Sequence, residues 1–92
     1  MRLEDALDNW LQISIVAKNR SSDRSAKDTV QFFTDMLKED HGVEKLSFEK
    51  TKDYYQVTYE QEGTTHIKSY RLDQAELLIQ QIQSEPRYNT SE

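Results

Sequence analysis

The 92-residue chain contains no cysteine, one proline and two glycines. Without cysteine it can form no disulfide and no thiolate metal site, and two glycines cannot supply a glycine-rich phosphate loop. No apolar run approaches the roughly 20 residues that a membrane-spanning helix needs. The acidic N-terminal sequence also lacks the basic region and apolar core of a signal peptide. We therefore expect a cytoplasmic protein without membrane contact.

Positive charge is also scarce, since 12 Lys and Arg stand against 17 Asp and Glu, for a formal net charge of -5. Binding to nucleic acid draws on phosphate contacts from a surplus of Lys and Arg, so the overall balance opposes it. Hydrophobic residues make up only 35% of the chain. Even with the glycines added, this stays below the roughly 45–50% of an average globular domain. A core this small makes association with a partner energetically useful.

Three stretches have the periodicity of amphipathic helices, and the first runs from Leu3 to Asn19. Acidic side chains in its first turn suit the positive end of the helix dipole. Between Trp10 and Ala17 the apolar surface wraps most of the way round, which indicates contact with more than one neighbour. Taken by itself, the stretch Ile13–Val16 also fits a strand.

The second predicted helix begins at Ser25 and ends near His41. Ser25 and Asp28 have the spacing of a capping box, in which the side chains satisfy the first free amides. Gly42 suits the left-handed position that follows a helix. These signals predict both ends of the helix.

The third predicted helix has the clearest start signal in the chain. Asp73 is the expected N-cap, and Glu76 is the acidic residue of its capping box. Leu72 and Leu77 then occupy the positions of a hydrophobic staple. Pro86 ends this helix, because the residue before a proline disfavours helical geometry.

Between the second and third helices the hydrophobic period changes from 3.6 to two, which predicts three strands. Leu46 and Phe48 mark the first strand, the stretch Tyr55–Tyr59 marks the second, and Thr64–Arg71 forms the third. Tight turns join them, as in a meander.

The turn at Glu62 and Gly63 allows two registers for the second hairpin. A two-residue loop would set Lys68 on the face of Val57, whereas a three-residue loop with Gly63 left-handed would set Ile67 opposite Val57. We predict the three-residue loop, because it buries Ile67 and leaves Lys68 in water, and because a slip by one residue exchanges the two faces.

The elements predict an α+β fold of two layers in the order α-α-β-β-β-α, with the helices packed on one face of a three-stranded antiparallel meander. Residues 1–86 are expected to form a single domain, and 87–92 a disordered tail. The uncovered face of the sheet is expected to show polar side chains and aromatic rings, namely Gln56, Thr58, Glu60, His66, Lys68 and Tyr70.

No set of residues points to catalysis, a metal or a cofactor. The serines lie in a loop and at a helix start, where their hydroxyls have structural uses, and no nucleophile or HExxH motif occurs. The adjacent residues Glu39, Asp40 and His41 do not share a helix face. We therefore predict that the chain is not an enzyme and holds no cofactor and no metal.

Protein binding is the leading functional prediction. The first helix has more apolar surface than one contact can bury, and Trp and Tyr are enriched at interface hot spots. The partner is another protein or a second copy of the chain, unless the same residues form the centre of a monomeric core. The candidate contact residues are Trp10, Leu11, Ile13, Ile15, Tyr54 and Tyr70.

The alternative prediction is a nucleic-acid-associated regulator. Lys18, Arg20, Arg24 and Lys27 cluster between the first two helices. Tyrosines on a sheet are also typical of surfaces that stack bases. The net negative charge and the acidic second helix oppose this interpretation.

Overall fold

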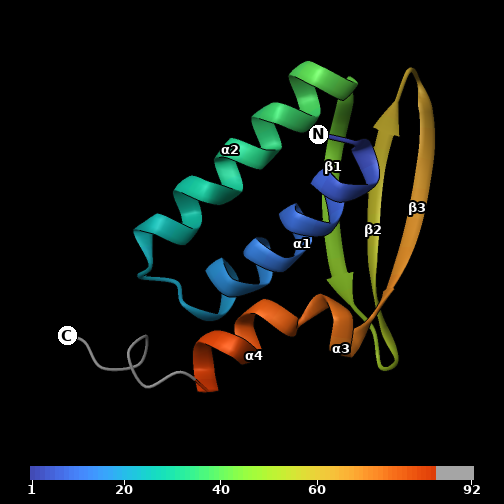
Figure 1. Cartoon of the computed structure of the whole chain (residues 1–92). Helices are drawn as coiled ribbons and strands as arrows, with labels where there is room; N and C mark the ends of the chain where they lie inside the picture. The colour runs from blue at the N-terminus through green and yellow to red at the C-terminus, as the bar shows by residue number, and fades with distance from the viewer. Residues whose placement is uncertain (85–92) are drawn as a thin grey trace.

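The computed structural model describes residues 1–84, and its elements follow the predicted order (Figure 1). Helices come first and last, and three antiparallel strands between them form one sheet of order β1-β2-β3. This confirms the α+β fold with helices packed on one face of a meander. The elements are α1 (Leu3–Asn19), α2 (Arg24–His41), β1 (Val43–Lys50), β2 (Tyr54–Gln61), β3 (Thr64–Arg71), α3 (Leu72–Ala75) and α4 (Leu77–Ser84). Pro86 and the predicted tail lie outside the described residues.

Helix α1 is the centre of the helical layer, with α2 on one side and α4 on the other (Figure 1). Its inward side chains are almost fully buried in a single core with the sheet and the other helices. The strand alternative for 13–16 is therefore excluded, and the extra apolar surface of this helix is used within the chain. Within α1, the residues at 1% exposure or less are Ala6, Leu7, Leu11, Ile15 and Val16.

Helix α2 begins slightly earlier than predicted. Its N-cap is Asp23, whose carboxylate accepts a hydrogen bond from the backbone N of Ala26 at 3.0 Å. Ser25 lies inside the helix, so the predicted capping box is wrong, because a carboxylate caps as well as a hydroxyl and also suits the helix dipole. The predicted end is confirmed, since Gly42 has a φ of 67° and its N–H bonds to carbonyls of the last turn.

Strand β1 contains a bulge that changes which side chains face the helices. The register with β2 shifts between Glu44 and Ser47, and Lys45 has a φ of 53°. Because one extra residue reverses the alternation of side chains, Val43 before the bulge and Phe48 after it both reach the core.

The predicted register of the second hairpin is wrong. Val57 pairs with Lys68, and the loop has two residues, Glu62 with a φ of 54° and Gly63 with a φ of 79°. Two positive φ angles are typical of the type I′ turn, whose twist matches that of paired strands. This preference outweighs the burial of one isoleucine, so Ile67 stays 60% exposed.

The same register corrects the predicted composition of the uncovered sheet face. Three of the six side chains expected there lie on the helix side, because they pair with the inward residues of β2. His66 stacks on Tyr59 with ring centroids 5.2 Å apart, and Tyr70 pairs with Tyr55. The uncovered face instead presents Thr65, Ile67 and Ser69 beside Gln56, Thr58 and Glu60.

The predicted start of the third helix is also wrong in detail. The helical segment begins at Leu72, no side chain caps it, and a single irregular residue, Glu76, separates α3 from α4. Glu76 turns toward the sheet instead of closing a capping box with Asp73, and Leu77 is 49% exposed. The hydrogen bonds that Glu76 accepts from β1 and β2 therefore decide the conformation of the segment between α3 and α4. Across residues 1–84, no helix has the length and apolar character needed to cross a membrane.

Replacing Glu62 with Asn should raise the free energy of unfolding by about 0.5–1 kcal/mol, because Asn tolerates a positive φ far better than Glu. Urea denaturation measures the change. Glu62→Ala removes the same charge but keeps the steric penalty, so it should give no such gain. An equal gain from both variants would contradict the assignment to backbone conformation.

Candidate functional site

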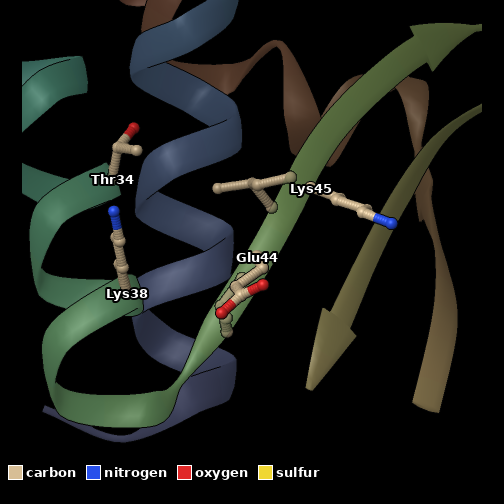
Figure 2. A pocket seen from close by; sticks show the side chains of 6 residues that line it. Thr34, Lys38, Glu44 and Lys45 are labelled. Atoms are coloured by element: carbon tan, nitrogen blue, oxygen red, sulfur yellow. The ribbon is translucent and has the colours of Figure 1, made fainter. Parts of the chain in front are cut away.

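Two hollows lie between α2 and β1, which meet at Gly42 and diverge (Figure 1). One hollow of about 410 Å³ lies near their junction, and Figure 2 shows α1 passing behind it. A second of about 380 Å³ lies farther along, and we call the two together the α2–β1 groove. The first is lined by Thr34, Lys38, Val43, Glu44, Lys45 and Leu46, and the second by Trp10, Ser14, Ala17, Lys18, Lys27, Val30 and Phe48.

Trp10 forms the floor of the groove and joins its walls. Its indole Nε1–H donates to Thr34 Oγ1 on α2 at 3.1 Å, and its ring meets Phe48 of β1 edge to face at 5.5 Å. The side chain is 5% exposed. The floor at Trp10 is therefore mostly apolar, and the N–H group of the indole ring already has its hydrogen-bond acceptor.

The rim of the groove is positively charged although the chain as a whole is acidic. Lys18, Lys27 and Lys38 line it, and no carboxylate of residues 1–84 forms an ion pair with any of them. Lys45 points away from α2 and pairs with Glu60 at 3.2 Å (Figure 2). Glu44 is the one carboxylate among the lining residues. Unpaired ammonium groups beside an apolar floor favour an acidic ligand.

Ser14 contributes a buried hydroxyl to the lining of this groove. The residue is 6% exposed, and its Oγ has no hydrogen-bond partner within the described part of the chain. A buried polar group without a partner destabilises a fold, because it gave up its hydrogen bonds to water.

A polar cluster next to the groove ties the sheet to the α3–α4 segment. The Tyr55 hydroxyl donates to Glu76 Oε2 at 2.7 Å, and Lys50 Nζ donates to the same oxygen at 3.0 Å. The hydrogen bond from Tyr55 lowers the pKa of Glu76, with a further contribution from Lys50. Burial and then Glu76 raise the pKa of Tyr55 well above its ordinary value. Neither group changes charge near neutral pH, so the cluster acts as a brace.

The structure does not bring the predicted contact residues together on one surface. Leu11 and Ile15 lie in the core, and Ile13 is partly buried in a hollow shared with Ile82 of α4. Tyr54 lies on the uncovered sheet face, whereas Tyr70 lies on the opposite face beneath the start of α1. A role for these residues in partner binding stays a prediction.

Burial also affects the chemistry of Tyr70. It raises the pKa of the Tyr70 phenol to about 12, with smaller contributions from Asp8, Tyr59 and Glu4. The hollow beside Tyr70 is lined by the carboxylates of Glu4, Asp5 and Asp8 and by one lysine, so its net charge is negative. This side of the molecule is therefore acidic, in contrast to the α2–β1 groove.

The four basic residues between the first two helices separate into two groups. Lys18 and Lys27 line the groove together, whereas Arg20 Nε bonds to Asp23 Oδ2 at 3.4 Å in a different hollow. Arg24 is exposed in the first turn of α2. Sequence reasoning missed Lys38, although its spacing from Lys27 places both on one face of a helix.

Both histidines contact other residues of the chain. A ring nitrogen of His41 lies 3.0 Å from the carbonyl oxygen of Met1, and His66 stacks on Tyr59. Within residues 1–84 no group of three or more His, Asp or Glu side chains is placed to hold a metal ion.

Replacing Ser14 with Ala should raise the free energy of unfolding by about 1 kcal/mol. The variant removes a buried hydroxyl that has no hydrogen-bond partner, and Ala has a higher helix propensity than Ser. Chemical denaturation checks this. Thr34→Val is the matched contrast, because it deletes a hydroxyl that accepts from Trp10, and it should lower stability. A loss of stability in Ser14→Ala would show that the hydroxyl has a partner.

Replacing Glu76 with Gln should lower the free energy of unfolding by about 1 kcal/mol at pH 7. Because folding lowers the pKa of Glu76 below its ordinary 4.5, its carboxylate stabilises the fold above that pH. The contribution is lost as pH falls through the folded pKa, so the two proteins should converge in acid. Denaturation from pH 7 to pH 3 measures this, with Glu49→Gln on the uncovered sheet face as control. A difference that stays constant with pH would contradict the assignment.

Comparison of the chain with protein-family models, with curated proteins and with solved structures finds no match in any of the three.

Proposed function

We propose that this chain is a small, non-enzymatic interaction module of the cytoplasm, a regulator or adaptor that binds a segment of another protein in the α2–β1 groove. The observation that carries the proposal is the groove itself, in which an apolar floor at Trp10 is surrounded by three lysines that have no ion-pair partner among residues 1–84. Interfaces combine a buried aromatic centre with a polar rim in this way.

In this proposal the partner docks in the groove, whereas the sequence predicts that it docks on the apolar surface of α1. Since most of the apolar face of α1 is buried within the chain, this helix contributes to the groove only through its edge at Trp10, Ser14 and Ala17, which forms the floor. The aromatic side chain of Trp10 would therefore support a bound segment from below. The surrounding side chains of α2 and β1 would make most of the contacts.

The nucleic-acid alternative has less support from the arrangement of charges. Arg20 is engaged by Asp23, and only Lys18 and Lys27 of the predicted basic cluster share one surface. Phosphate binding draws on several converging cations, and affinity falls steeply as salt rises. We keep nucleic acid as an outcome that the experiment below can detect.

Photo-crosslinking from the groove tests the proposed function. A photoreactive phenylalanine analogue is placed at Lys27 or Lys38, and at Lys52 as a control, since all three are exposed. After nuclease treatment of a source-cell lysate, we expect a discrete crosslinked protein from the two groove positions and none from Lys52. A species of twice the chain mass would identify the partner as a second copy.

Two results would contradict this proposal. The same products from Lys27, Lys38 and Lys52 would show that the groove is not selective. Products that disappear after nuclease treatment would instead favour the nucleic-acid-associated regulator.

A further inference from the structure

We propose that the occupant of the α2–β1 groove is an extended, Asp- and Glu-rich segment of the partner protein that adds to the sheet as a fourth strand beside β1. This inference rests on the proposed function, because it names the chemistry of the partner and its mode of binding. Strand addition is an established way in which domains recognise extended peptides, with main-chain hydrogen bonds giving affinity and side chains giving specificity.

The outer edge of β1 is open to pairing with a further strand. No other strand of residues 1–84 lies beyond β1, which pairs with β2 alone. Thr51 N donates to Tyr54 O at 2.8 Å, and hydrogen-bonded pairs alternate along an antiparallel ladder. The backbone groups of Ser47 and Glu49 therefore point to β2, and those of Phe48 and Lys50 point to the open edge.

The open edge of β1 borders the α2–β1 groove. A strand added at the usual spacing of about 4.8 Å lies between β1 and α2, where the two hollows of the groove are found. Its alternate side chains would point to the floor formed by Trp10 and Ala17. The bulge at Lys45 disturbs the other end of β1, so the pairing is expected along the stretch after Ser47.

Electrostatics selects the chemistry of the added strand. Lys27 and Lys38 project from α2 on the far side of the groove, and Lys18 lies 5.8 Å from the ring of Phe48. Carboxylates on an added strand would meet these ammonium groups, which have no ion-pair partner in the described residues. Lys50 is already bonded to Glu76 and is not required for this contact.

Charge also makes the other free edge of the sheet, at β3, and a second copy of the chain unsuitable for this role. Beside β3 lies the hollow lined by Glu4, Asp5 and Asp8 together with Lys68, and its net negative charge would repel an acidic strand. Two copies of a chain of net charge -5 also repel each other as they approach.

Amide hydrogen exchange followed by NMR tests the inference on the full chain. The probe is an eight-residue peptide of alternating Glu and Val with blocked termini, added to millimolar concentration. We expect exchange at Phe48 and Lys50 to slow on binding, whereas Ser47 and Glu49 should already be protected by β2. The same peptide N-methylated at alternate amides should lose this protection, because it cannot pair along the edge.

Charge variants test the expected attraction between the carboxylates of the peptide and the lysines of the groove. The double variant Lys27→Gln, Lys38→Gln should weaken peptide binding by about fivefold or more, and Lys52→Gln should leave it unchanged. All three positions are exposed, so the fold should be unaffected. A peptide of alternating Lys and Val should bind more weakly than the acidic peptide.

The outcomes separate this inference from the proposed function. Groove signals that shift without slower exchange at Phe48 and Lys50 would overturn strand addition and leave groove binding intact. No shift at millimolar peptide, with crosslinking from the groove retained, would overturn the acidic strand alone. Protection that grows with protein concentration in the absence of peptide would identify a second copy as the occupant and would also overturn it.

Discussion

The burial of the apolar face of α1 against three neighbouring elements is the constraint on which the rest of this structure depends. A chain with 35% hydrophobic residues has to use each one well, and α1 places its inward side chains against the sheet, α2 and α4 at once. Trp10 is where these contacts converge, with a hydrogen bond to α2 and a ring contact to β1. The loss of this side chain would therefore remove contacts that join α1, α2 and β1 at one point.

This central position of α1 also creates the groove. Since α2 packs along α1 and meets β1 only near Gly42, the two elements diverge over most of their length (Figure 1). The space between them is floored by the edge of α1, and the outer edge of β1 remains without a strand among residues 1–84. Thus the arrangement that gives a small chain one compact core also leaves a hollow next to an open strand edge.

Local signals in the sequence predicted much of this fold, and the errors occur where two partners compete for one group. The bounds of α1 and the left-handed Gly42 follow from periodicity and backbone sterics, which act within a few residues. The local pattern predicts a capping box for Glu76, yet its carboxylate accepts a hydrogen bond from Tyr55, which is distant in sequence. The register at Gly63 was decided by turn twist against burial of Ile67, and sequence alone does not weigh these two energies.

The candidate site likewise contains some residues that local sequence patterns predict and others that only the fold brings together. Lys18 and Lys27 could be found as a basic cluster, but Lys38 joins them only through the path of α2, and Arg20 leaves them because Asp23 is nearer. The net charge of -5 concealed the groove, since a sum over the chain says nothing of where the charges lie. Acidic side chains gather beside β3 and unpaired lysines beside β1. A domain with opposite charges at its two sheet edges can orient an approaching charged strand before any contact forms.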